Sequence, residues 1–294
     1  MKRVVSVSLG SSKRDKTETI RLLGEEVEVS RQGTDGDLKR FAARFRELDG
    51  KVDALGIGGA DLYLVAGGRR YTFRQIASIV RGLRTPVVDG SGLKNTLERE
   101  AILRLQREGT VDFRASRTLL VSSVDRFGMA EALAKIGGPV VYGDLLYGLG
   151  LPFPVRSYGT VKVLAALLLP VLTQLPIQWL YPTGAKQEAR TPKHTRYFEE
   201  SDVIAGDWHF IRRFAPERLP AKTILTQTLR AADFEMLRQA GVARTILTTP
   251  EIGGESFATN VMEAALIAVA PGKNLADLVR EAGWGPTVKD LAVP

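Results

Sequence analysis

The stretch Leu119-Leu120-Val121-Ser122-Ser123-Val124-Asp125-Arg126-Phe127-Gly128 decides the fold of this chain. A short apolar run ends in a polar turn, and apolar residues then recur at helical spacing, at Met129, Ala132, Leu133 and Ile136. This order predicts a buried strand, a turn and an amphipathic helix. A strand that is followed at once by a helix is the repeating unit of a parallel α/β sheet.

More strand-like segments follow, at intervals that leave room for helices between them. They are Val140–Tyr142, Val203–Ala205, Thr223–Thr226 and Thr245–Thr248. This rhythm predicts a Rossmann-like, doubly wound parallel sheet. We therefore expect a nucleotide-binding domain over residues 113–294.

The first part of the chain shows the same alternation of strands and helices. Its predicted strands are Val4–Leu9, Glu25–Arg31, Ala54–Ile57 and Pro86–Asp89, and Tyr63–Phe73 carries the Gly67-Gly68 turn of a β-hairpin. A polar stretch at residues 108–117 separates the two parts. We expect an α/β substrate domain over residues 1–112, which makes the whole chain a two-domain α/β protein.

Composition narrows the class of protein. The chain has 294 residues, 44% of them hydrophobic and 25% charged, as in ordinary globular proteins. The absence of cysteine excludes disulfides, thiolate metal sites and cysteine nucleophiles, and two histidines argue against a zinc site. The first residues lack the long apolar run of a signal peptide. These features predict a cytoplasmic protein.

The net charge of +8 suits anionic ligands, but the basic residues are spread along the chain. That spread argues against nucleic acid as the partner. The apolar segment Val161–Tyr181 has nearly the length of a membrane span, yet Pro170 and Pro176 interrupt it. We interpret it as a broken, buried crossover helix or a subunit interface rather than a membrane segment. A homodimer is therefore possible.

Ligands of open α/β sheets bind beyond the carboxyl ends of the strands. In the loop at residues 122–128, Ser122, Ser123 and Arg126 could contact phosphate, and Asp125 would have to be paired or cap the helix. Gly128 takes the place of the third glycine of a dinucleotide loop, and the other two glycines are missing. The loop fits a cofactor site or a structural turn equally well.

Two aspartates follow later strands. Asp144 lies 144 − 123 = 21 residues after Ser123, where dinucleotide sites place the acid that binds ribose, so it favours NAD over NADP. A turn or a helix cap is the alternative for Asp144. Asp207 opens a loop with His209 that could cover a nicotinamide or a substrate.

The first part offers a second group of polar residues after its strands. Asp89 and Lys94, around a glycine-rich turn, could form a proton-transfer pair, although Asp89 is also a good helix cap. Ser11 and Ser12 follow the first strand and suit a carboxylate or a phosphate, or lie in a solvated loop.

The segment Asp89-Gly90-Ser91-Gly92-Leu93, with its following helix and strand, resembles the link between domains in the shikimate and quinate dehydrogenase family. The chain is most similar to bacterial members labelled quinate 5-dehydrogenase, over Val5–Asp15, Asp89–Glu98 and Asp125–Ala132. The resemblance implies that Asp89 is the catalytic acid beside a lysine, here Lys94. It also implies that Ser11 and Ser12 hold the substrate carboxylate.

These observations predict an NAD(P)-dependent oxidoreductase, with NAD as the cofactor. Its substrate would be a secondary alcohol on a small carboxylated ring of the quinate or shikimate type. The family's own lysine segment and the glycine fingerprint have no match here, which motivates a second hypothesis. This alternative is a non-catalytic nucleotide- or metabolite-binding protein on the same fold. A transferase or lyase for a phosphorylated substrate is a third.

Overall fold

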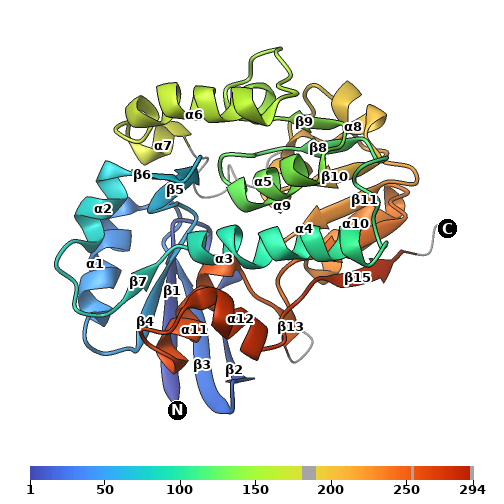
Figure 1. Cartoon of the computed structure of the whole chain (residues 1–294). Helices are drawn as coiled ribbons and strands as arrows, with labels where there is room; N and C mark the ends of the chain where they lie inside the picture. Colours follow the sequence, from blue (N-terminus) through green and yellow to red (C-terminus); the bar gives the residue numbers. More distant parts are fainter. Residues whose placement is uncertain (181–189, 253–254, 292–294) are drawn as a thin grey trace. The chain divides into compact units, whose positions relative to one another are not determined.

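The computed structural model describes residues 1–180, 190–252 and 255–291 (Figure 1). The chain forms two compact units, and it crosses between them repeatedly. Unit 1 comprises Met1–Leu93, Leu167–Gln187 and Ile252–Trp284, and unit 2 comprises Lys94–Ala166, Glu188–Glu251 and Gly285–Pro294. The first crossing, between Leu93 and Lys94, comes before the boundary expected at residues 112–113.

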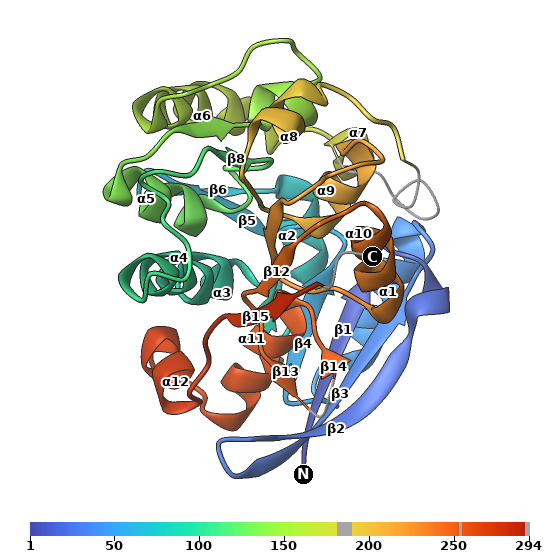
Figure 2. The same ribbon diagram turned by 90° about the vertical axis from the view of Figure 1, so that its right-hand side faces the viewer.

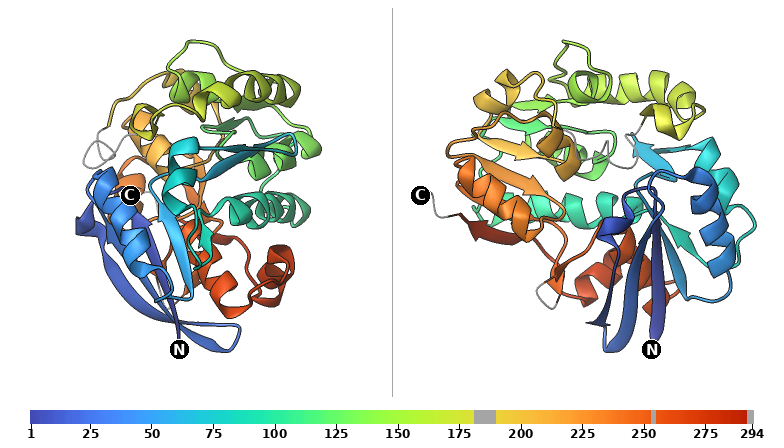
Figure 3. Two further views of the ribbon diagram at one scale, coloured as in Figure 1. Left: turned by 90° about the vertical axis from the view of Figure 1, so that its left-hand side faces the viewer. Right: turned by 180° about the vertical axis from the view of Figure 1, so that it is seen from behind.

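Unit 1 contains a five-stranded sheet in the order β2-β3-β1-β4-β7. Its strands are β1 (Lys2–Ser8), β2 (Lys16–Leu22), β3 (Glu25–Gly33), β4 (Ala54–Gly58) and β7 (Val87–Val88). Strands β3, β1, β4 and β7 run parallel, and β2 pairs antiparallel with β3 at the edge. Figure 3 shows β1, β2 and β3 side by side at the N-terminal end of the chain. A separate hairpin, β5 (Tyr63–Ala66) and β6 (Arg69–Thr72), turns at the two predicted glycines.

Helices cover this sheet, and one of them comes from far along the sequence. Unit 1 holds η1 (Ser12–Arg14), α1 (Leu38–Leu48), α2 (Arg74–Val80), α7 (Ile177–Leu180), α11 (Thr259–Val269) and α12 (Leu275–Glu281). Almost every residue of α11 is buried, and this helix packs on β1 and β4 (Figure 2). The buried amide of Asn260 donates to the hydroxyl of Ser6 at 2.6 Å. The C-terminal third of the chain therefore completes the core of the N-terminal sheet.

Unit 2 contains a six-stranded sheet in the order β15-β12-β11-β10-β8-β9. Its strands are β8 (Thr118–Leu120), β9 (Val140–Tyr142), β10 (Val203–Ala205), β11 (Thr223–Thr226), β12 (Arg244–Leu247) and β15 (Thr287–Asp290). All neighbours are parallel except β15, which pairs antiparallel with β12. In chain order the parallel strands lie 2-1-3-4-5, as in flavodoxin-like sheets, whereas a Rossmann dehydrogenase sheet has the order 3-2-1-4-5-6. The α/β class and the parallel sheets are confirmed, and the assignment to a dehydrogenase sheet is not.

The core of unit 2 combines apolar strand residues with aromatic rings. The helices of this unit are α4 (Leu97–Arg107), α5 (Phe127–Ile136), the π-helix η2 (Asp144–Gly148), α8 (Arg196–Glu200), α9 (Trp208–Phe214) and α10 (Ala231–Gln239). Tyr147 of η2 contacts the rings of Phe198 and Phe214, with centroids 5.4 and 5.3 Å away. Leu119, Ile204, Ile224 and Leu247 extend this core along the strands. A short two-stranded sheet, β13 (Glu251–Ile252) with β14 (Glu255–Ser256), completes the strands of the described residues.

Two helices begin or end at a crossing between the units. The short α3 (Ser91–Asn95) leads from unit 1 into unit 2, and α6 (Tyr158–Leu172) leads back. The apolar segment expected over Val161–Tyr181 therefore consists of α6, with Pro170 inside it, and α7; Tyr181 itself lies outside the described residues. None of the described helices has both the length and the apolar character that spanning a membrane requires. Only one face of α6 is buried within the chain, so the first alternative, a buried crossover helix, holds for that face alone, and the second alternative, a subunit interface, stays a prediction.

Candidate functional site

The topology of unit 2 marks one place on its sheet. The chain goes from β8 through α5 to β9 on one side, and it later returns to add β10 on the other side of β8. The loops that leave the carboxyl ends of β8 and β10 thus diverge, and this is the switch point at which open α/β sheets bind ligands. The polar residues that follow β8 and β10 form our candidate site.

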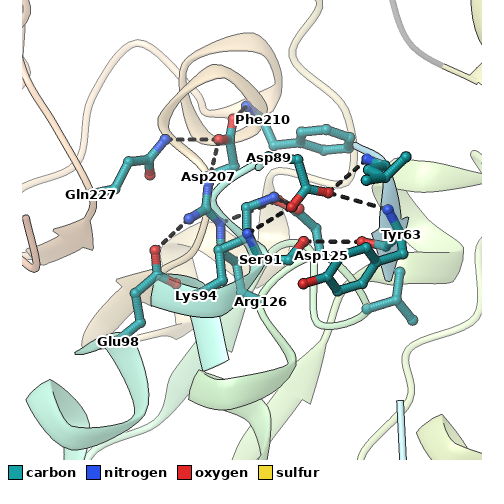
Figure 4. Close-up of polar contacts among 12 residues, drawn as sticks. Tyr63, Asp89, Ser91, Lys94, Glu98, Asp125, Arg126, Asp207, Phe210 and Gln227 are labelled. Atoms are coloured by element: carbon teal, nitrogen blue, oxygen red, sulfur yellow. Dashed lines mark hydrogen bonds and ion pairs between the residues drawn. The ribbon is translucent and has the colours of Figure 1, made fainter. Parts of the chain in front are cut away.

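Arg126 lies in the centre of this site and contacts three carboxylates (Figure 4). Its Nη1 donates to Glu98, its Nη2 lies 2.8 Å from Asp207, and its Nε lies 3.1 Å from Asp125. The Nζ of Lys94 lies 2.6 Å from the other oxygen of Asp125. These five side chains, from α3, α4, the loop after β8 and the loop after β10, are called the Arg126 network below.

Asp207 links this network to two further loops. Its Oδ1 accepts the backbone N–H groups of His209 and Phe210 and so caps α9, while its Oδ2 accepts Arg126 and Gln227. Burial by itself raises the pKa of Asp207, but Arg126, His209 and the bond from Gln227 outweigh it and lower the pKa to about 2. Asp207 is therefore ionised at neutral pH.

The net pKa shift of Glu98 goes the other way, because here burial outweighs the cations. Its side chain is fully buried in the first turn of α4, and burial raises its pKa to about 7 although Arg126 and Lys94 favour the ionised form. When Glu98 is ionised, the network holds three carboxylates against two cations. Both cations are already paired with carboxylates, so the network does not attract a phosphate group.

Several buried polar atoms at the carboxyl edge of this sheet have no hydrogen-bond partner among the described residues. They are Ser122 Oγ after β8, Trp208 Nε1 after β10, and Thr248 Oγ1 and Thr249 Oγ1 after β12. Ser122 is 5% exposed and both threonines are 0% exposed. Because strands lie about 4.8 Å apart, the β8 and β12 ends are separated by roughly 14 Å along this edge. Buried polar atoms without a partner are costly, and a ligand can supply the missing bonds.

Asp144 and Gly128 have local roles in the structure. Ser123 Oγ and the Val124 N–H at 2.9 Å both donate to the Asp144 carboxylate, which therefore holds the loop after β8 in place. Burial raises the pKa of Asp144, and the bond from Ser123 opposes that rise. A Cβ on Gly128 would collide with the backbone carbonyl of Lys94. The glycine is thus explained by close backbone packing and does not require a pyrophosphate.

The remaining predicted site residues belong to unit 1. Asp89 is buried, and its carboxylate accepts the N–H groups of Leu62 at 2.6 Å, Tyr63 at 3.1 Å and Ser91 at 3.0 Å (Figure 4). It therefore ties the end of β7 to the start of the β5–β6 hairpin.

Ser11 and Ser12 lie in the loop between β1 and β2. Ser11 Oγ accepts the Lys13 N–H, and the Ser12 N–H donates to Asp35 at 2.7 Å. Their part in binding a ligand stays a prediction.

The structure brings together four of the predicted site residues, Lys94, Asp125, Arg126 and Asp207. Sequence reasoning missed Glu98, which carries no local signal beyond one acid among apolar helix positions. It placed Ser122 and Thr248 at strand ends but could not show that their hydroxyls, or the hydroxyl of Thr249, lack partners among the described residues. Among the described residues, no group of three or more histidine and acidic side chains is placed to hold a metal ion.

Two family models match this chain. Residues 92–291 match the family described as Domain of unknown function (DUF8754), and residues 3–89 match Domain of unknown function (DUF8753). No curated protein matches the chain in sequence. The two matched segments meet near residue 90.

Solved structures show only distant similarity. An ABC transporter solute-binding protein from Burkholderia multivorans is 12% identical with a TM-score of 0.38, over 99% of each chain. A galactofuranose-binding protein is 12% identical with a TM-score of 0.37, over 99% of this chain and 95% of its own. A periplasmic ribose ABC transporter from Conexibacter woesei is 11% identical with a TM-score of 0.38, over 99% and 92%. Scores this low do not establish a common ligand.

Three expectations from the sequence are corrected by these findings. The assignment to the shikimate and quinate dehydrogenase family was wrong, because the families that match the chain are the two described as domains of unknown function. The oxidoreductase function and the NAD cofactor were wrong for the same reason. Their physical basis is also lost, because Asp144 is occupied by the loop after β8 and Arg126 by three carboxylates.

Proposed function

The chain belongs to the family described as Domain of unknown function (DUF8754), and we propose that it binds a small, neutral, hydroxyl-rich metabolite without transforming it. The binding site in this proposal is the carboxyl edge of the unit 2 sheet, where β8 and β10 diverge. The observation that carries the proposal is Ser122 Oγ, a buried hydroxyl at the switch point with no partner among the described residues.

The hydrogen bonds of Asp125 and Asp207 support binding rather than proton transfer by these two side chains. Both oxygens of Asp207 accept two hydrogen bonds each, and Asp125 is shared between Lys94 and Arg126. Carboxylates with this many donors are held in one orientation, and Asp207, whose pKa is lowered to about 2, stays ionised. The network therefore fixes the loops around the site, as a preformed binding site requires.

The charge balance supports the choice of ligand class. A nucleotide or another phosphorylated compound would meet three carboxylates whose two cationic partners are already engaged. A neutral molecule avoids this repulsion. Its hydroxyl groups both donate and accept, so they match the unpartnered atoms Ser122 Oγ and Trp208 Nε1, which follow the neighbouring strands β8 and β10. Small sugars and polyols are the chemical class that fits.

A thermal-shift panel tests this proposal directly. The wild-type protein is heated with millimolar pentoses, hexoses and polyols, and with NAD and inorganic phosphate as anionic comparators. A ligand at 100 times its dissociation constant stabilises a protein by about 2.7 kcal/mol, which raises Tm by a few degrees. We expect a neutral compound to give the largest shift, and titration calorimetry then measures its Kd.

Ser122→Ala removes the hydroxyl that carries the proposal, and we expect it to weaken binding by about tenfold or more. Ser201→Ala is the matched control, because Ser201 is also buried in unit 2 but its hydroxyl donates to Tyr197 O at 2.7 Å. Equal Kd values for wild type and Ser122→Ala would remove Ser122 from the site. A larger shift with NAD or phosphate than with every neutral compound would overturn the ligand class.

The cytoplasmic location expected from the sequence is part of the same proposal. A chain without cysteine has no need of an oxidising compartment. Cell fractionation with an antibody to the native protein tests this point, and recovery outside the cytoplasmic fraction would contradict it.

A further inference from the structure

The outer face of α6 is apolar and exposed. Val163 is 59% exposed, Leu167 is 67% exposed and Val171 is 64% exposed, and their spacing of four residues places them in one row along the helix. Six of the eight large hydrophobic side chains that are exposed among the described residues lie between Leu149 and Val171. Scattered exposed apolar residues need no explanation, but a concentration of this kind marks a contact surface.

The inner face of α6 is already used within the chain. Val161, Ala165 and Leu169 are each less than 5% exposed. A helix that is apolar on all sides is normally buried on all sides, whereas a surface helix normally has polar residues facing water. The outer row is therefore a second contact face that the chain itself leaves uncovered.

The charges around this face are compatible with a copy of itself. Residues 145–187 contain no aspartate or glutamate, and Lys162 is the only charged residue of α6. An acidic partner segment has only this one cation on α6 to pair with. In an antiparallel pair centred on Leu167, the two Lys162 residues lie about 15 Å apart, because each is five residues from the centre. Two copies of α6 that pair in this way therefore bring no like charges into contact.

The exposed apolar area of this part of the chain also suits a symmetric interface. Full burial of one Val or Leu removes roughly 60–120 Å² of apolar area, so the outer row and the exposed apolar residues of the segment that leads into α6 (Leu149, Leu151 and Phe153) together offer about 300–400 Å² in each copy. Each partner in a standard interface buries about 800 Å², of which a little over half is apolar. The exposed polar residues Gly159, Thr160 and Lys162 supply a rim of the usual kind.

We infer that this face is the interface of a homodimer, in which α6 packs antiparallel against α6 of a second copy about a two-fold axis at Leu167. A two-fold interface uses the same patch on both copies, so Val163 of one copy lies opposite Val171 of the other. The small residues Ala166 and Pro170 alternate with the large ones and give the second helix a groove to enter.

Light scattering after gel filtration tests the dimer, and the expected mass is twice the 32.1 kDa of one chain. Leu167→Glu places two carboxylates at the axis and should give the monomer. Val288→Glu is the matched control, because Val288 is an exposed apolar residue on β15 and its replacement should leave the dimer intact. A monomeric wild type, or a dimer that survives Leu167→Glu, overturns the inference.

The absence of cysteine allows a second test that does not depend on charge. Under mild oxidation Leu167→Cys should form a disulfide-linked dimer, because disulfides need Cα atoms within about 7 Å. A mixture of Val163→Cys and Val171→Cys chains should cross-link more than either variant alone. Val288→Cys should not cross-link. Cross-linking of Val288→Cys as fast as Leu167→Cys would mean random collision and would overturn the interface.

Discussion

The carboxylate of Glu98 lies against the guanidinium of Arg126, and neither side chain is more than 3% exposed. Two further carboxylates, Asp125 and Asp207, share the same guanidinium. A buried ion pair of this kind contributes little net stability while it is complete, but the loss of one partner is costly. The Arg126 network therefore fixes the positions of the loops after β8 and β10 more than it adds stability.

Glu98→Gln should change how stability depends on pH. The pKa of Glu98 is about 7 in the folded chain against an ordinary 4.5, so the folded state holds a proton that the unfolded state has released. This group therefore lowers the free energy of unfolding as pH rises from 4.5 through 7. We expect that fall to shrink by up to ~3 kcal/mol in Glu98→Gln, at about 1.4 kcal/mol per pKa unit.

Urea unfolding of both proteins between about pH 5 and 8 measures the effect. Glu108→Gln is the control, because Glu108 is an exposed acid at the other end of the same helix and its pair with Arg104 is open to solvent. Parallel stability curves for wild type and Glu98→Gln would show that Glu98 does not titrate in this range.

Arg126→Met should destabilise the protein by about 3–5 kcal/mol, because it leaves three carboxylates without their shared cation. Arg117→Met is the comparison. Arg117 also pairs with an aspartate in unit 2, Asp202, but the two side chains are 60% and 46% exposed, so the loss of this pair should have a much smaller effect. Urea unfolding at one pH compares the two variants, and similar losses would contradict a special role for Arg126.

Local sequence patterns predicted most strands of both sheets. The alternation of apolar runs with helical spacing gave Val203–Ala205 and Thr223–Thr226 with the bounds that the structure has. The edge strand β2 was missed because most of its residues are exposed, so no apolar pattern marks it. The place of α11 was also missed, since packing of Thr259–Val269 on β1 depends on contacts across the whole chain.

Individual residues of the candidate site could be predicted from the sequence, but their contacts with one another could not. Asp125, Arg126 and Asp207 could be found because each follows a predicted strand. Their pairing with one another, and with Glu98, could not be found, because it depends on how α4 packs beside the loop after β8. The dehydrogenase hypothesis followed from reading these residues one by one. As a network they have neither the spare cation nor the open carboxylate that a dinucleotide needs.

Asp89→Asn should destabilise the protein by about 1–3 kcal/mol, because Asp89 uses both carboxylate oxygens to accept backbone N–H groups. An asparagine keeps only one acceptor oxygen. Asp37→Asn is the matched control: Asp37 caps α1 through Oδ1 alone, and asparagine caps helices as well as aspartate does. Thermal unfolding of both variants checks this, and an unchanged Tm for Asp89→Asn would contradict the assigned role.

Gly128→Ala should cost about 1–3 kcal/mol, because the new methyl group meets the backbone carbonyl of Lys94, which cannot move without shifting α3. Gly148→Ala adds the same methyl group where no atom lies within 4 Å, and it should be neutral or slightly stabilising. Urea unfolding gives both values. If only Gly128→Ala loses stability, with no nucleotide present, this glycine serves the packing of α5. If Gly128→Ala is as stable as the wild type, Gly128 returns to the candidate ligand-binding residues.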